Sequence, residues 1–153
     1  FSSRRRHTRY IGDWSSDVCS SDLALRPLAQ MRSGRLWCVF GCGGDRDRGK
    51  RAEMGRVAQA LADHVLLTSD NPRTEDPMAI IRDIRLGTNA QEHNVQVQLD
   101  RALAIAQALQ EAAPEDVVLI AGKGHETYQE VGLERRAFSD AQQVHLALRQ
   151  EAA

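Results

Sequence analysis

A continuous apolar run, LWCVF at residues 36–40, leads directly into the glycine-rich loop GCGG at residues 41–44. A short run without polar alternation is typical of a strand that is buried on both faces of a parallel sheet. The glycines that follow allow a tight turn from this strand into the next element. Residues 51–62 then place apolar side chains at helical spacing, which completes one strand-and-helix unit.

The same unit recurs along the rest of the chain. Alternation of strands and helices predicts an α/β fold, a three-layer, Rossmann-like, mostly parallel sheet with helices on both faces and a small C-terminal β-hairpin. The apolar side chains of the helix after residue 100 are expected to be Leu103, Ile105, Ala106 and Leu109. We expect strands at 36–40, 64–68, 94–99 and 117–121, helices at 51–62, 77–86, 100–112 and 139–149, and a hairpin at 127–131 and 134–138.

Residues 1–23 do not fit this pattern. The segment, FSSRRRHTRYIGDWSSDVCSSDL, has no helical or alternating apolar period, and the tripeptide Ser-Ser-Asp occurs twice in it. Its arginines could form a basic nucleic-acid arm, but no apolar core follows them as it would in a signal peptide. The segment resembles translated sequencing-adapter read-through. We therefore expect residues 1–23 to be non-native, disordered and without an evolved function.

Charge and cysteine content narrow the class of protein. Outside residues 1–23 the chain has 16 basic and 18 acidic residues, which disfavours a general nucleic-acid surface. No apolar run approaches the roughly 20 residues that a membrane-spanning helix needs. Cys38 lies in the apolar run and Cys42 follows it, at a spacing that matches neither a metal knuckle nor a redox pair. We expect one cytoplasmic domain of about 130 residues.

The glycine-rich loop at residues 41–50, GCGGDRDRGK, nearly matches two phosphate-binding motifs. A P-loop would need serine or threonine after Lys50 to bind magnesium, and Arg51 stands there instead. A dinucleotide motif would need a third glycine where Arg46 stands, and the two aspartates of the loop would repel phosphate. The loop therefore predicts no autonomous nucleotide site. Its basic groups could meet another anion, or the loop is a solvated, charged turn.

A second strand-end loop carries the tetrapeptide Asp70-Asn71-Pro72-Arg73. The Asn-Pro pair predicts a turn, because proline fixes its own φ and disfavours a helical conformation in the residue before it. The turn leaves a guanidinium and a carboxylate at the carboxyl end of a strand, where open α/β sheets bind ligands. Such a pair suits a zwitterion such as an amino acid, and an ordinary solvated ion pair is the alternative.

A third loop, Gly122-Lys123-Gly124-His125-Glu126, follows the most apolar strand. Its glycines allow the backbone to approach a ligand closely, and its side chains supply both signs of charge. By itself the segment also fits an ordinary glycine turn, and a single histidine is more often structural than catalytic. Because all three loops leave the same edge of the predicted sheet, we expect their side chains to converge on one site.

Three stretches together resemble a known family: RLWCVFGCGGDRDRGKR at residues 35–51, SDNPRTEDP at 69–77 and VVLIAGKGHETYQ at 117–129. From about residue 23 to the end, the chain resembles the C-terminal domain of the Mur ligases, most closely those that add meso-diaminopimelate. The resemblance implies an enzyme of peptidoglycan synthesis. With ATP and Mg²⁺ such an enzyme activates a carboxylate of a UDP-N-acetylmuramoyl dipeptide as an acyl phosphate, which the amino group of meso-diaminopimelate attacks.

The resemblance assigns the incoming amino acid to this domain, whereas other domains of the family bind ATP, the metal ions and the UDP-sugar. It implies a domain at residues 35–153, preceded at 24–34 by the remnant of an interdomain helix and linker. We therefore expect a ligase fragment that has no catalytic or metal-binding residues and is inactive alone. The expected binding residues for meso-diaminopimelate are Arg46, Asp70, Asn71, Pro72, Arg73, Gly122 and Glu126.

Arg73 also bears on substrate choice. Related ligases that add lysine resemble this loop but carry alanine at the arginine position, and lysine lacks one carboxylate of diaminopimelate. Leaving a buried arginine without that carboxylate would cost about 3–5 kcal/mol, so Arg73 favours diaminopimelate. The competing hypothesis is a standalone α/β module that binds an amino acid or an anion, which would require this chain to be the complete gene product.

Overall fold

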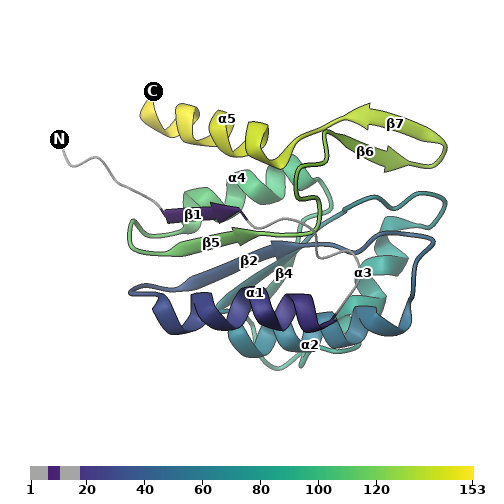
Figure 1. Ribbon diagram of the computed structural model, residues 1–153, viewed down its shortest axis with the longest axis horizontal. Helices are drawn as coiled ribbons and strands as arrows, with labels where there is room; N and C mark the ends of the chain where they lie inside the picture. The colour runs from purple at the N-terminus through teal and green to yellow at the C-terminus, as the bar shows by residue number, and fades with distance from the viewer. Residues whose placement is uncertain (1–6, 11–17) are drawn as a thin grey trace.

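The computed structural model describes residues 7–10 and 18–153, with side chains described from residue 22 onward. A parallel sheet forms its centre, and a two-stranded antiparallel hairpin lies beside the sheet (Figure 1). The elements follow one another as β1 (His7–Tyr10), α1 (Val18–Met31), β2 (Leu36–Phe40), α2 (Gly49–Leu61), β3 (His64–Leu67), α3 (Pro77–Arg85), β4 (Val95–Val97), α4 (Arg101–Glu111), β5 (Val117–Ile120), β6 (Tyr128–Val131), β7 (Glu134–Ala137) and α5 (Asp140–Ala152).

The sheet has the strand order β1-β5-β2-β3-β4, and all its pairs are parallel. β2 lies at its centre, where Cys38 stands opposite Leu119 on one side and Val65 on the other. Every residue of β2 is buried, as the continuous apolar run predicts. Helices α1, α2 and α3 cover one face and α4 and α5 the other (Figure 1). The predicted three-layer α/β fold with its C-terminal hairpin is therefore confirmed.

Side-chain caps fix where three of the helices begin. Asp76, Asp100 and Ser139 each precede a helix and accept a hydrogen bond from a backbone amide of its first turn. Pro77 occupies the first position of α3, where its missing amide costs nothing. Among the apolar side chains expected in α4, Leu103 is 56% exposed at the start of the helix.

The beginning of the domain differs from the sequence expectation. α1 starts at Val18, and its Leu25 and Leu28 are buried in the core on the α2 side of the sheet. Within residues 24–34, Ala24, Leu25 and Leu28 thus contribute to the core. β1 pairs with β5, so the expected disorder does not hold at residues 7–10, nor where α1 includes residues 18–23. The rest of that expectation, at residues 1–6 and 11–17, lies outside the described residues.

A buried ion pair holds the C-terminal helix against the ends of two strands. Arg101 at the start of α4 donates from Nε and Nη2 to the Asp140 carboxylate, both at 2.7 Å, and both side chains are fully buried. The same guanidinium donates to the carbonyl oxygens of Ala121, at 2.9 Å, and Ser69, at 3.4 Å. These carbonyls precede the second and third loops, so the pair fixes the points from which both loops leave the sheet.

Candidate functional site

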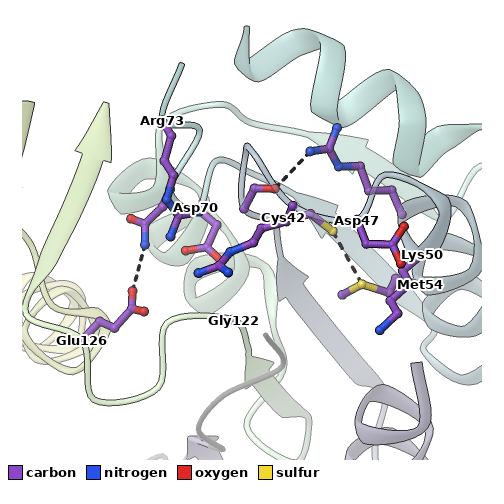
Figure 2. Close-up of a pocket in the computed structure, with 13 residues that line it drawn as sticks. Cys42, Asp47, Lys50, Met54, Asp70, Arg73, Gly122 and Glu126 are labelled. Atoms are coloured by element: carbon purple, nitrogen blue, oxygen red, sulfur yellow. Dashed lines mark hydrogen bonds between the residues drawn. The ribbon is translucent and has the colours of Figure 1, made fainter. Parts of the chain in front are cut away.

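The three strand-end loops meet in one pocket of about 390 Å³. It lies at the carboxyl ends of β2, β3 and β5, where an open parallel sheet binds ligands. Figure 2 shows Arg73 and Glu126 on one side of the pocket and Lys50 and Asp47 on the other. The predicted convergence is therefore observed. The lining residues are Gly41, Cys42, Gly43, Arg46, Asp47, Lys50, Arg51, Met54, Asp70, Asn71, Arg73, Gly122 and Glu126.

Glycines of the first loop let it approach the second. A Cβ on Gly41 would lie 2.1 Å from the carbonyl oxygen of Thr68, and one on Gly44 would lie 1.8 Å from that of Pro72. A Cβ on Gly43 would lie 2.9 Å from the Arg73 guanidinium. Gly41 and Gly44 therefore need to be glycine because a Cβ would meet backbone, whereas at Gly43 the flexible end of the Arg73 side chain could move. Pro72 packs behind the loop and is the one expected binding residue that does not line the pocket.

Arg51 joins the first loop to the acids that follow the second. Its guanidinium is 1% exposed and donates to both oxygens of Glu75, to Asp83 and to the carbonyl of Gly43, at 2.8–3.1 Å. Its hydrogen bond to Glu75 lowers the pKa of that carboxyl from 4.5 to about 2. Sequence reasoning treated Arg51 only as a mismatch to a P-loop. Its position one turn before Met54, on the buried face of α2, was the signal for a structural role.

Lys123 is the second buried cation of the site, and it joins the third loop to the second. Its ammonium donates to Asn71 Oδ1 at 2.7 Å and to the carbonyl of Tyr128 at 2.9 Å. It also lies 3.3 Å from a carboxylate oxygen of Asp70 and 3.3 Å from one of Glu126. The side chain is fully buried, so it serves as an internal counter-ion for the two acids. The sequence placed Lys123 in the loop without this role.

Asp70 and Asn71 make most of their contacts within the protein. Burial raises the pKa of the Asp70 carboxyl, although Arg101 and Lys123 act in the opposite direction. Asn71 accepts from Lys123 and from the amide of Glu130, and it donates to Glu126 Oε2 at 3.0 Å (Figure 2). Both residues line the pocket as expected, yet their side chains mainly hold its walls together.

Arg73 reaches the pocket from a strained backbone position. Its φ of 52° lies in the left-handed region, which is uncommon for a residue with a side chain. Its Nη1 donates to the carbonyl of Gly44 at 2.9 Å, and its Nε lies 2.9 Å from the Glu130 carboxylate. The side chain is 25% exposed and is a partly solvated cation at the pocket rim.

The pocket therefore presents charges of both signs. Arg46, Lys50 and Arg73 line it as cations, and Asp47 and Glu126 line it as acids. The arrangement suits a small molecule that carries carboxylates and ammonium groups.

The thiol in the pocket is un-ionised, and the described residues contain no cluster of metal ligands. Burial, with Asp70 nearby, raises the pKa of the Cys42 thiol to about 12, so this cysteine stays protonated. In the part of the chain that the structure describes, no three His, Cys, Asp or Glu side chains gather to hold a metal ion. Within the same residues, no helix has the length and apolar character to cross a membrane.

This chain is an α/β domain whose strand-end loops line a pocket of mixed charge. Such an arrangement is typical of domains that bind small molecules. The sequence model of one family, described as "Mur ligase, glutamate ligase domain", matches residues 3–124. This chain belongs to that family. The match begins within the segment that was expected to be non-native.

Sequence comparison with individual proteins supports membership in this family. The chain is 61% identical over 125 residues to the UDP-N-acetylmuramoyl-L-alanyl-D-glutamate–2,6-diaminopimelate ligase of Acidovorax sp. (strain JS42), covering 82% of this chain and 25% of that one. The protein of the same name from Coxiella burnetii is 49% identical over 144 residues, covering 94% of this chain and 29% of that one. The chain thus spans about a quarter of the length of these curated relatives.

Solved structures give the same result. A structure of a UDP-N-acetylmuramoyl-L-alanyl-D-glutamate–2,6-diaminopimelate ligase superposes with a TM-score of 0.87 at 42% identity, covering 94% of this chain and 30% of that chain. A bifunctional folylpolyglutamate synthase/dihydrofolate synthase from Yersinia pestis superposes over 78% of this chain and 27% of that chain, with a TM-score of 0.56 at 21% identity. That second likeness concerns the fold alone.

Proposed function

We propose that this chain is the amino-acid-binding part of an ATP-dependent ligase that adds meso-diaminopimelate to UDP-N-acetylmuramoyl-L-alanyl-D-glutamate in cytoplasmic peptidoglycan synthesis. The relatives that carry this name, at up to 61% identity over most of the chain, support the substrate. The observation that carries the proposal is the pocket of mixed charge with Arg73 at its rim.

The charges of the pocket can be matched to the proposed substrate. Meso-diaminopimelate carries an ammonium and a carboxylate at each end. Arg46 and Arg73 would donate to a carboxylate, and Glu126 would accept from an ammonium. Glu126 Oε2 is already engaged by Asn71 and Lys123, so Oε1 is the oxygen that this geometry offers to the ligand. Gly122, with a φ of 113°, brings its backbone to the pocket wall without a Cβ.

The residues of this chain do not fit ATP with Mg²⁺. Lys50 follows the spacing of a P-loop, but Arg51 occupies the place of the magnesium-binding hydroxyl and is held by Glu75 and Asp83. ATP and Mg²⁺ would therefore be bound mainly by other parts of the parent ligase. Acyl-phosphate formation also belongs to those parts, so we propose that this chain alone is inactive.

Binding of meso-diaminopimelate and of L-lysine to the purified chain tests the substrate assignment. Isothermal titration of the parent chain should show tighter binding of meso-diaminopimelate than of lysine. Arg73→Ala should weaken meso-diaminopimelate binding by about 10- to 100-fold, because a charge-assisted hydrogen bond contributes about 1.5–3 kcal/mol. Lysine binding should change little.

Arg149→Ala removes an equal charge from the last turn of α5 and is the matched control. Equal affinity of the parent chain for the two amino acids would contradict the assignment, as would an Arg73→Ala chain that binds meso-diaminopimelate normally.

A further inference from the structure

Glu130 on strand β6 lies between two arginines. One carboxylate oxygen, Oε2, is 2.9 Å from Nε of Arg73, and the other, Oε1, accepts a hydrogen bond of 2.9 Å from Nη2 of Arg135. The guanidinium of Arg135 stacks at 4.1 Å over the ring of Tyr128 on the same hairpin. This row, Arg73–Glu130–Arg135, was not identified from the sequence, because Glu130 was read only as part of a strand.

The backbone of the hairpin holds Arg73 as well. The amide of Arg73 donates to the carbonyl of Glu130 at 3.2 Å, and the amide of Gly132 donates to the carbonyl of Arg73 at 2.7 Å. These two bonds form an isolated parallel bridge between Arg73 and Val131. Since Arg73 has a positive φ, which is costly for a residue with a Cβ, the bridge stabilises a conformation that the loop alone would disfavour.

Two of the three nitrogens of the Arg73 guanidinium have partners within the protein. Nε forms an ion pair with Glu130, and Nη1 donates a hydrogen bond to the carbonyl of Gly44. Within the described residues Nη2 donates no hydrogen bond, and Arg73 lines the pocket. An arginine whose Nη1 is hydrogen-bonded and whose Nε is ion-paired keeps less rotamer freedom, so its remaining donors lose less entropy when a ligand binds.

The charges of the row leave Arg73 attractive to an anion. Glu130 alone would neutralise Arg73, but Arg135 adds a second positive charge, so the three side chains together carry one net positive charge. Glu130 remains ionised in this setting, because its hydrogen bond to Arg135 lowers its pKa.

We propose that Glu130 is a positioning residue that aims Arg73 at the ligand carboxylate, and that Arg135 compensates the charge of Glu130 so that the row still attracts that carboxylate. The proposal rests on the proposed function, because the ligand carboxylate is that of meso-diaminopimelate. It makes the β6–β7 hairpin a determinant of amino-acid selectivity through Arg73, although no residue of the hairpin lines the pocket.

The hairpin offers a matched control for the test. Glu134 and Arg136 pair with each other at 3.1 Å, and their side chains are 72% and 63% exposed. Glu130→Ala and Glu134→Ala therefore remove the same charge from the same hairpin, and Arg135→Gln is matched by Arg136→Gln. Two quantities are measured on the full chain. They are the solvent exchange rate of the Arg73 Nε–H proton, assigned by its loss in Arg73→Lys, and the affinity for meso-diaminopimelate at low salt.

Glu130→Ala should speed the Arg73 Nε–H exchange by about fivefold or more and weaken meso-diaminopimelate binding about tenfold, since a charge-assisted contact is lost. Glu130→Gln keeps an oxygen acceptor, so both changes should be smaller. Arg135→Gln should weaken binding a few-fold, as expected for a partly exposed charge. Glu134→Ala and Arg136→Gln should alter neither quantity.

Tighter binding by Glu130→Ala would overturn the proposal, because it would make Glu130 a competitor of the ligand carboxylate. Unchanged Nε–H exchange in Glu130→Ala would overturn it too, because Arg73 would not be held by Glu130. A third outcome is that Glu130→Ala speeds the Arg73 Nε–H exchange but the parent chain does not bind meso-diaminopimelate. That result would support the contact between Glu130 and Arg73 and would overturn the proposed substrate. The two proposals therefore fail in distinguishable ways.

Discussion

At the scale of single residues, two buried cations organise the ligand loops. Arg51 and Lys123 are 1% and 2% exposed, and each joins segments that are distant in the sequence. Arg51 contacts an acid 24 positions away, and Lys123 contacts Asn71 at a separation of 52. The sequence could place Asp70, Arg73 and their neighbours at strand ends because those residues form short motifs. It could not reveal the long-range contacts, because no local pattern reports them.

The Arg51–Glu75 pair predicts a pH dependence of stability. The pKa of Glu75 falls from 4.5 to about 2 in the folded chain, so the folded state favours the ionised form. The stabilisation is therefore fully present above pH 4.5 and is lost as the pH falls from 4.5 toward 2. Glu75→Gln should lower the melting temperature at pH 7 and flatten its decline in this acid range.

Thermal unfolding followed by circular dichroism from pH 7 to pH 2.5 measures this effect. Glu92→Gln, at an exposed position, is the control and should follow the parent curve. Parallel curves for the parent and Glu75→Gln would show that the pair does not contribute.

At the scale of elements, local signals placed most strands and helices correctly. The apolar runs predicted β2, β3 and β5, Pro77 predicted the start of α3, and the caps at Asp100 and Ser139 predicted the starts of α4 and α5. Helical spacing accounts for the exposure of Leu103, because it lies about 200° around the helix from Ile105, whose face is the buried one. The contact between Arg101 and Asp140, which joins α5 to the strand ends, could not be predicted, because the two residues are 39 positions apart.

The buried Arg101–Asp140 ion pair should contribute to the stability of the fold. Asp140→Asn leaves a buried guanidinium without its counter-ion, so the free energy of unfolding should fall by about 3 kcal/mol or more. The double variant Arg101→Met with Asp140→Leu should recover much of that loss, because an apolar pair can replace a buried ion pair. Urea unfolding followed by fluorescence measures both.

Glu115→Gln, at an exposed position, should leave the free energy of unfolding unchanged. A loss for Asp140→Asn no larger than that of this control would contradict the inferred role of the pair.

At the scale of the whole molecule, we propose that residues 1–23 are foreign in origin and that residues 24–153 supply the stability of the domain. Neither the pairing of β1 with β5 nor the extent of the family match reports the origin of a sequence. The core contribution of α1 comes from Leu25 and Leu28, whereas Leu23 is 74% exposed.

Deletion of residues 1–23 should therefore leave the melting temperature unchanged within about 2 °C, which is less than about 1 kcal/mol for a domain of this size. Scanning calorimetry of the parent and shortened chains measures the difference. Leu25→Ala, which empties a buried position, should lower the melting temperature clearly and shows that the assay is sensitive. A large loss on deletion would assign β1 a structural role.

The β6–β7 hairpin has a consequence for how this domain can change over evolutionary time. None of its residues is buried, every residue of β7 is exposed, and the hairpin contacts the ligand loops through Arg73 and Lys123. A substitution there alters the surroundings of Arg73 without emptying a core position. Under the proposed function, selection can therefore vary the hairpin to adjust which amino acid is accepted, while the sheet and its helices, which supply the stability, stay the same.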